Sequence, residues 1–557
     1  MTARSAVRDW RARAGALRSF PWRDRLHLLP VAIAVVYLIV MVGELRYLVT
    51  ATNWNSDSAS SSVIAESLGA QPGRPSVVLG QFGWYVTLWF DLATKWLPGH
   101  RQIWQAAPYA MALGGIALIA WSSLRVAGRR AAAITAAALV CGSPAVLANL
   151  FSPTLHTTTW FALSVLVASM VFAVTRDGAA RLSFGLAVAF VAGAVAGACA
   201  ASDPLLWLAG IAPLVVSTAA AALVARGPAV RRLLASTGVT VAAAIVAAVV
   251  AGAIMRGQGF RVMAPATRFA GIDEIGRNAV LLAKVVLHLG NGYFPAKPID
   301  ARGVLTVVCA LIAVAGLAAP LLLLRRVLGE RTRGTQPERG MTRLAFASYW
   351  AAVVVLLVVA FIFSTFPLDV SATRYVIPLV FAAAAAAPLL AEGSWRKQTL
   401  VVAAVTVFAT ANLISLANRD VTAPAIGVRL HQDEIVRFLE RERLTVGYAG
   451  YWNAASFTWQ SRFRFEVYPV WECPGQPTLC PFFFHSVSSW YRPRANHRTF
   501  LIVDPPWGWV TRPPAPAFGR PARVLRAGQV TVYVFGYDIA SRFGPRVRPP
   551  PAGTPAE

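Results

Sequence analysis

A single carboxylate, Asp57, stands among small hydroxyl residues directly after the first long apolar segment, in residues 53–62 (NWNSDSASSS). A carboxylate beside hydrocarbon is costly and tends to face a protein interior or a water-filled cavity, which makes Asp57 a candidate for proton transfer. The alternative is structural, because residues 58–68 have helical character and Asp is a preferred residue just before a helix. On position alone, the two interpretations are equally good.

Arg374 and Tyr375 form a second candidate group, in the segment RYVIP at residues 374–378, where a late apolar span begins. A guanidinium offers a planar fork of donors that matches the oxygens of a phosphate. We therefore regard Arg374 as a candidate phosphate ligand. The alternative is a simple ion pair with Asp369.

Two short turns on the side of the membrane predicted to face outward carry one titratable side chain each. His156 is a candidate ligand or proton carrier, although a histidine at an interface is more often only hydrogen-bonded. Asp203 precedes Pro204 and can instead cap the next span, because Pro fits the first turn of a helix. With Glu66 and Asp91 of the first long loop, these are the candidate substrate-binding residues.

A long loop at residues 256–303 is basic although it is predicted to face outward. Arg261 and Lys284 are candidates to bind an anionic headgroup or a phosphate. Pairing of the basic residues with Asp273 and Glu274 is an equally good explanation of the pattern.

The elements that must position these residues are membrane spans. Hydrophobic residues make up 56% of the 557 residues and the mean hydropathy is +0.55, well above soluble averages. Apolar runs of the length that crosses a bilayer recur along the chain. The predicted spans are 28–47, 104–125, 131–150, 157–175, 182–201, 204–225, 234–255, 304–324, 345–365, 376–391 and 399–417. The fold class is therefore a polytopic α-helical membrane protein with about eleven transmembrane helices.

The net charge of +27 does not indicate nucleic-acid binding, because most arginines before the C-terminal tail fall in short loops between spans. Cytoplasmic loops carry an excess of Lys and Arg. Clusters that include Arg125, Arg226 and Arg396 therefore predict a cytoplasmic N-terminus and an extracytoplasmic C-terminal region. No small-residue cleavage site follows the first apolar run, so we expect a retained span in the plasma (inner) membrane.

Composition divides the chain into four regions. These are a basic cytoplasmic N-terminus (1–26), a membrane domain (27–417) with long outer loops at 48–103 and 256–303, a small extracytoplasmic α/β domain (418–540) and a disordered Pro-rich tail (541–557). In the first long loop we expect two helices along the membrane surface, at 58–68 and over the aromatic stretch 77–97. In the second, residues 275–289 have an amphipathic helical pattern.

Cys473 and Cys480 lie close together in the polar C-terminal region. On the oxidising side of a membrane such a pair predicts a local disulfide. A zinc site would need two more ligands, and the spacing of the nearby His485 and His497 does not support one. Cysteines within the spans are expected to be small core residues.

These features together resemble the GT-C glycosyltransferases, which use polyprenyl-phosphate sugars. The matching pieces are Ser56-Asp57 with the helix after it, the RYVIP segment at 374–378, the topology of 28–417 and a C-terminal external domain. The segment GYAGYWNAA at 447–455 also resembles external-domain segments of bacterial members, which include aminoarabinose, mannosyl and arabinosyl transferases. Protein O-mannosyltransferases belong to the same superfamily.

The resemblance implies that Asp57 is the general base for an acceptor hydroxyl and that the reaction inverts configuration. It implies that Arg374 holds the donor phosphate, with Tyr375 beside it and with Lys284 or Arg261 assisting. The first-loop motif has one acid where some relatives have an Asp-Glu pair, so we expect no metal. No cofactor is expected beyond the polyprenyl-phosphate-linked sugar.

The acceptor is expected to be a cell-envelope glycan, a lipid or a protein, and the sequence favours no particular oligomeric state. A lipid or glycan transporter or flippase is the alternative class, and a noncatalytic envelope scaffold is another. Transporters often contain inverted repeats and broken helices in matching halves. The two halves of this sequence differ, which favours the enzyme.

Overall fold

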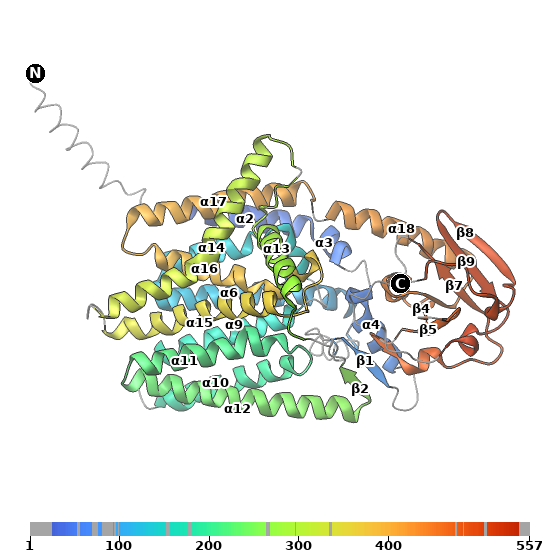
Figure 1. Cartoon of the computed structure of the whole chain (residues 1–557), viewed down its shortest axis with the longest axis horizontal. Coiled ribbons are helices and arrows are strands. Elements are labelled where there is room, and N and C mark those ends of the chain that lie inside the picture. The colour runs from blue at the N-terminus through green and yellow to red at the C-terminus, as the bar shows by residue number, and fades with distance from the viewer. Residues whose placement is uncertain are drawn as a thin grey trace, which may run out of the picture.

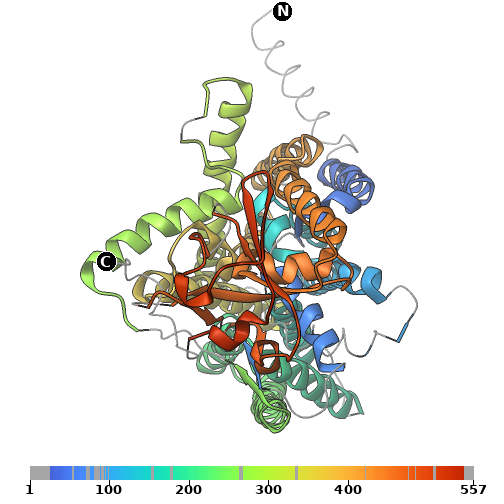
Figure 2. The same cartoon turned by 90° about the vertical axis from the view of Figure 1, so that its right-hand side faces the viewer.

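The computed structural model describes residues 25–52, 56–69, 76–80, 88, 93, 96–97, 100–151, 156–175, 180–262, 268–295, 297–332, 337–420, 422–473, 476–482, 484–505 and 510–544. Its helices form a bundle, and the C-terminal strands lie beyond one end of that bundle (Figure 1). Seen from that end, the strands lie across the bundle (Figure 2). The chain is thus a helical membrane protein with a β-rich C-terminal region, as predicted.

Eight apolar helices in the described part of the chain are long enough to cross a membrane. They are α6 (His100–Ala127), α9 (Thr157–Thr175), α10 (Ala180–Ala200), η2 with α11 (Trp207–Ile211 and Ala212–Val224), α12 (Pro228–Gly257), α14 (Ala301–Thr332), α15 (Pro337–Phe363) and α17 (Trp395–Ala417). The shorter apolar helix α2 (Leu28–Gly43) lies beside α17. The predicted spans fall on these helices and on two bent pairs.

The bent pairs correct the prediction of straight spans at 131–150 and 376–391. Helix α7 (Arg129–Val140) meets α8 (Pro144–Leu150) at 87°, and the 3-10 helix η3 (Val370–Val376) meets α16 (Pro378–Leu390) at 53°. A proline starts the second helix of each pair, where its missing N–H costs nothing. At the first break, the hydroxyl of Ser143 also caps α8 by accepting from the amide of Val146.

Glycine allows the closest contact in the bundle that we describe, between α10 and α12. A Cβ atom on Gly193 would lie 2.2 Å from the carbonyl oxygen of Thr240, and one on Gly197 would lie 2.1 Å from that of Ala244. Two glycines four residues apart let helix backbones approach closely. In a membrane the hydrophobic effect does not drive helices together, and this close van der Waals packing favours their association instead. The spacing of Gly193 and Gly197 therefore sets the distance between these helices.

The turns that join α11 to α12 and α16 to α17 lie at the end of the bundle opposite the strands, as do the end of α14 and the start of α15 (Figure 1). Basic residues adjoin these turns and helix ends: Arg226, Arg231, Arg232, Arg325, Arg326, Arg331, Arg396 and Lys397. One end of the bundle is therefore basic. The assignment of that end to the cytoplasm remains a prediction from the charge rule.

The first long loop begins with α3 (Leu45–Thr52) and α4 (Ser56–Gly69), and α4 matches the helix predicted at 58–68. The surface helix predicted at 77–97 is wrong at its start, because Val77–Leu79 forms the strand β1. Strand pairing supplies the physical reason, since β1 has a partner on each edge. Most of residues 81–95, including Asp91, lies outside the described residues.

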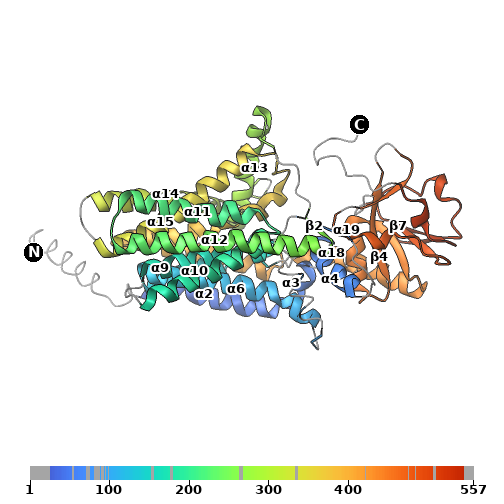
Figure 3. The same ribbon diagram turned by 90° about the horizontal axis from the view of Figure 1, so that it is seen from below.

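Three segments that are far apart in sequence share one small sheet. Strand β1 pairs in parallel with β2 (Phe260–Val262), from the second long loop, and antiparallel with β6 (Ser486–Val487), from the C-terminal region. The long helix α12 leads into β2 at this junction (Figure 3). Helix α13 (Ile272–Leu289) follows, and the amphipathic helix predicted at 275–289 lies within it.

The C-terminal region contains a six-stranded sheet in the order β5-β4-β3-β7-β9-β8. Its elements are α18 (Thr422–Arg441), β3 (Val446–Gly450), α19 (Tyr451–Gln460), β4 (Glu466–Glu472), β5 (Leu479–Pro481), β7 (Thr499–Val503), β8 (Arg523–Ala527) and β9 (Val530–Phe535). The central strands β4, β3 and β7 run parallel. Strand β3, the first of the three in the chain, lies between β4 and β7 in the sheet.

Substitution of Gly197 by Leu should lower the stability of the bundle by about 1–3 kcal/mol, the usual cost of overpacking. The reason is that the new Cβ would overlap the backbone of α12 at Ala244. The measurement is the melting temperature of the detergent-solubilised protein. Gly185→Leu is the matched control on α10, because nothing lies within 4 Å of a Cβ at that position; equal losses in the two variants would contradict the packing argument.

Candidate active site

Asp57 lies in the first turn of α4, at the junction between the bundle and the C-terminal region. The helix starts at Ser56, so Asp57 is inside the helix and is not the residue before it, as the capping interpretation required. Its side chain is buried, with 8% of the residue exposed. The hydroxyl of Tyr451, at the start of α19, donates a hydrogen bond to its Oδ1.

Ser56 connects the same two helices. Its hydroxyl donates to the carbonyl oxygen of Tyr451 and accepts from the amide of Ala455 at 3.1 Å. These two backbone groups are four residues apart, the spacing of a backbone hydrogen bond within a helix. Ser56 thus contacts the first turn of α19 and holds the neighbouring Asp57 close to Tyr451.

Behind Tyr451 lies His485, whose Nδ1 is 2.8 Å from the Tyr451 hydroxyl oxygen. Burial lowers the pKa of His485 to about 4, and the charge on Asp57 only partly opposes this. Burial also raises the pKa of Tyr451, and the charge of Asp57 adds to that effect. At neutral pH His485 is therefore uncharged and Tyr451 keeps its proton.

Arg374 and Tyr375 lie in η3, directly before α16. A guanidinium nitrogen of Arg374 donates to the Tyr375 hydroxyl at 2.9 Å, and the guanidinium carbon lies 5.0 Å from the ring centre. Asp369 caps η3 by accepting from the amide of Ser371 at 2.7 Å. The carboxylate that was the alternative partner of Arg374 thus has a structural role at the start of this helix.

A third group lies on the other side of Tyr375. His156 Nδ1 is 2.5 Å from Oδ2 of Asp203, and the Thr159 hydroxyl donates to the same oxygen at 2.5 Å. The amide of Leu205 donates to the other oxygen of Asp203 at 3.2 Å. The His156 ring packs edge-on against Tyr375 with ring centres 5.4 Å apart.

The electrostatic coupling joins these groups into one site. The charge of Asp57 acts on both Arg374 and Tyr375, and the charge of Asp203 acts on Tyr375. An acid from the front of the chain and a guanidinium from near its last spans are therefore close enough for their charges to interact. This arrangement pairs a carboxylate that can accept a proton with a cation that can neutralise an anion.

Other predicted residues are not brought into this group. Lys284 is exposed on α13 and Arg261 is exposed on β2. Among the described residues, no hydrogen bond or ion pair joins the side chain of either one to Asp57 or Arg374. Glu66 lies half-buried near the end of α4, and Asp91 is outside the described residues.

Sequence reasoning missed Tyr451 and His485 as site residues. The only available signal was the segment 447–455, which drew attention as a family-like motif without a role for any of its side chains. Tyr451 is separated from Asp57 by 394 residues in sequence. Without the fold, nothing in the residue types links them.

The side chain of Tyr451 is closely packed in the C-terminal region. Its ring stacks on Phe482 with centres 4.5 Å apart, and it shares a buried cluster with Cys473 and Cys480. These two cysteines form a disulfide with a Cα–Cα distance of 5.2 Å. The disulfide thus closes the segment that packs against Tyr451.

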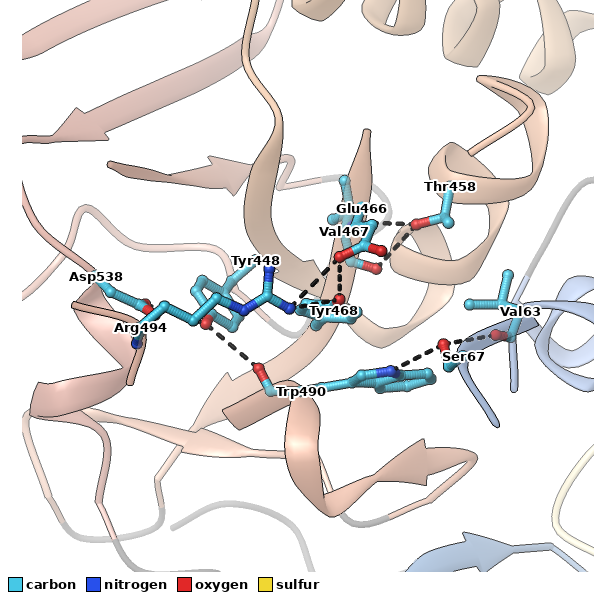
Figure 4. A network of polar contacts seen from close by, with 10 residues as sticks. All are labelled: Val63, Ser67, Tyr448, Thr458, Glu466, Val467, Tyr468, Trp490, Arg494 and Asp538. Atoms are coloured by element: carbon cyan, nitrogen blue, oxygen red, sulfur yellow. Dashed lines mark hydrogen bonds and ion pairs between the residues drawn. The ribbon is translucent and has the colours of Figure 1, made fainter. Parts of the chain in front are cut away.

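A second contact holds the C-terminal sheet on α4. The indole N–H of Trp490 donates to the Ser67 hydroxyl at 3.1 Å, and Ser67 donates to the carbonyl of Val63 at 2.8 Å (Figure 4). Behind Trp490, Tyr468 stacks on its ring with centres 5.0 Å apart. Both ends of α4 are therefore attached to the sheet.

An apolar cavity of about 1130 Å³ lies among α14, α16 and α17. Leu379 and Val380 line it, a few residues after Arg374 in the chain. Its other lining residues include Gly316, Ala404, Arg325 and Lys397. The cavity therefore extends along the bundle from the vicinity of η3 towards the basic end.

Two solved structures match this fold over most of their length. Both are crystal structures of ArnT from Cupriavidus metallidurans, one bound to undecaprenyl phosphate and one in the apo state. The first has a TM-score of 0.52 at 13% identity and covers 91% of this chain and 99% of its own. The second has a TM-score of 0.53 at 13% identity and covers 91% and 98%. No protein-family model and no curated protein matches the sequence.

The chain has the fold of these ArnT structures. The sequence resemblance is thus confirmed at the level of the fold. The described residues contain no group of three or more His, Cys, Asp or Glu side chains that could hold a metal ion. Metal independence remains a prediction.

The contacts of Asp203 within the helix bundle predict a supporting role for this carboxylate. Asp203→Ala should cost about 1–3 kcal/mol, because His156 and Thr159 would lose a buried partner. Thr159→Val, which keeps the shape and removes one donor, should cost about 1 kcal/mol. Melting temperatures test both; an unchanged melting temperature with a raised KM would instead show that Asp203 contacts substrate.

Proposed function

We propose that this protein is a membrane glycosyltransferase that moves a sugar from a polyprenyl-phosphate donor to an acceptor on the extracytoplasmic side. The observation that carries the proposal is the buried Asp57, which accepts a hydrogen bond from Tyr451 of the C-terminal region and whose charge acts on Arg374. The fold supports it, because an ArnT structure of the same fold is bound to undecaprenyl phosphate. Neither the sugar nor the acceptor follows from these observations.

Asp57 is the proposed general base. It accepts the proton of the acceptor hydroxyl while the acceptor oxygen attacks the anomeric carbon from the face opposite the phosphate. The bond between that carbon and the phosphate oxygen breaks, and its electron pair leaves on the polyprenyl phosphate. The products are an inverted glycoside, a protonated Asp57 and the free lipid phosphate.

Arg374 is the proposed phosphate ligand. Its guanidinium is held by the Tyr375 hydroxyl, and Tyr375 is itself packed between His156 and Phe366, whose ring centre lies 4.3 Å away. A preorganised cation stabilises the charge that develops on a leaving phosphate without reorganising during the reaction. Tyr375 is accordingly a supporting residue for Arg374.

The apolar cavity suits the carrier of the donor. It begins near η3 and its volume of about 1130 Å³ exceeds the roughly 1,000 Å³ upper range of pockets for small molecules. A polyprenyl chain is apolar along its whole length, as are most of the walls. We propose that this cavity receives the chain while the phosphate lies at Arg374.

The orientation that follows has the basic end of the bundle in the cytoplasm and the C-terminal sheet outside. The disulfide fits this orientation, because such bonds persist in oxidising compartments. The acceptor would be a glycan, lipid or protein of the cell envelope. No metal and no cofactor beyond the donor are proposed.

Asp57→Asn should abolish sugar transfer, with a loss of about 100-fold or more expected for a missing general base. The assay measures transfer from a radiolabelled polyprenyl-phosphate sugar in proteoliposomes, alongside the melting temperature. Asp273→Asn, an exposed carboxylate in the first turn of α13, is the control and should leave transfer unchanged. Full transfer by Asp57→Asn would remove the proposal, and lipid flux without any new glycosidic bond would identify a transporter.

Ala404→Phe should raise the KM for a long-chain donor, because Ala404 lines the apolar cavity and the larger ring would fill it. A donor with a two-isoprene chain should be affected much less. Ala403→Phe is the matched control, since Ala403 is exposed on the same helix and does not line the cavity. The measurement is the KM for each donor length; equal changes for both lengths would contradict the placement of the chain.

A further inference from the structure

We infer that Tyr451 and His485 of the C-terminal region are positioning residues for Asp57, so that the base is complete only when that region is docked on α4. The inference rests on the proposed function, because it assigns a role to the neighbours of the proposed base. It adds two residues that the resemblance to other glycosyltransferases did not indicate. A contact between the sheet and the catalytic helix thereby becomes part of the chemistry.

His485, Tyr451 and Asp57 form a chain of hydrogen bonds in which each donor points towards Asp57. Tyr451 has a single hydroxyl proton, which it donates to Oδ1 of Asp57. Its oxygen must therefore accept from His485, so Nδ1 of His485 carries the proton at the 2.8 Å contact. The order is His485 to Tyr451 to Asp57, and it ends on the carboxylate.

The consequence for Asp57 is a fixed orientation. Oδ1 is occupied by Tyr451, which leaves Oδ2 to take the proton of the acceptor. A hydrogen bond from a neutral donor favours the ionised form of a carboxylate, which is the form that a general base needs. Since His485 and Tyr451 are both neutral at neutral pH, they orient and stabilise Asp57 without cancelling its charge.

The topology explains why these two side chains reach α4. Tyr451 follows β3 directly, and β3 lies between its parallel neighbours β4 and β7. The carboxyl ends of parallel strands are where α/β sheets place functional groups. His485 directly precedes β6, which pairs with β1 of the first long loop. Each residue is thus anchored by backbone structure on one side and faces Asp57 on the other.

The test compares Tyr451→Phe with the wild-type protein in the transfer assay. The ring and its stacking on Phe482 remain, and only the hydroxyl is lost. We expect kcat to fall about 10- to 100-fold, the range for a hydrogen bond to a charged group. We also expect the acid limb of the kcat/KM profile to move to higher pH by about one pH unit, because a carboxylate without its donor is protonated more easily.

The groups that face Asp57 are Arg374 and Tyr375 from η3 and Tyr451 and His485 from the C-terminal region. Arginine and tyrosine keep their protons throughout the acid limb. Burial lowers the pKa of His485 to about 4, so Tyr451→Phe is also compared in a protein in which His485 is replaced by Asn. A displacement of the limb that persists there cannot come from the imidazole and reports on the carboxylate.

Tyr448→Phe is the matched control, because Tyr448 is a buried tyrosine of the adjacent strand β3 whose hydroxyl donates to Asp538 at 3.2 Å. It should reduce stability without moving the acid limb. His485→Leu should act in the same direction as Tyr451→Phe, and His485→Asn should restore activity, since its amide can donate from the position of Nδ1. The melting temperature of each variant is measured as well, and a variant that does not fold is left out of the kinetic comparison.

The outcomes separate this inference from the proposed function. If Asp57→Asn loses transfer while Tyr451→Phe keeps both kcat and its acid limb, the positioning role is wrong and the enzyme stands. If Tyr448→Phe shifts the limb as much as Tyr451→Phe, the effect is one of docking in general and the inference is overturned. If Asp57→Asn retains transfer, the proposed function itself fails.

Discussion

The contact between the first turn of α4 and the first turn of α19 is the interaction on which the site depends. Ser56 makes hydrogen bonds to two backbone groups of α19, and Asp57 next to it accepts from Tyr451. Buried polar groups are costly unless each finds a partner. A polar first turn of α4 is therefore required on physical grounds, because an apolar residue at position 57 would leave the buried hydroxyl of Tyr451 without this acceptor.

The polar network around Tyr375 shows a second constraint. Arg374, His156 and Asp203 come from three parts of the chain, and Tyr375 contacts or is coupled to all of them. Ionisable groups near hydrocarbon are tolerated when they pair with one another. Tyr375 holds the Arg374 guanidinium in place through its hydroxyl and its ring.

Much of this architecture could be predicted from the sequence. Apolar runs located the spans. The arginine-rich segments between spans adjoin helix ends that lie together at one end of the bundle, as the charge pattern predicts. The helices at 58–68 and 275–289 were found from pattern alone. Periodicity fails where pairing over long distances decides the structure: Val77–Leu79 is a strand only because β2 and β6 lie on either side. The bend between α7 and α8 was also not predicted, because hydrophobicity averaged over the whole apolar run does not show where the helix breaks.

The small sheet of β2, β1 and β6 has a consequence for biogenesis. Its strands come from residues 77–79, 260–262 and 486–487, so the last strand is synthesised after every span has been made. Contacts between residues so distant in sequence pay the entropy of loop closure before they return any stability, and they form late. A ribosome-bound or truncated chain that ends before the C-terminal region therefore carries Asp57 without the hydrogen bond from Tyr451 and without the third strand of this sheet.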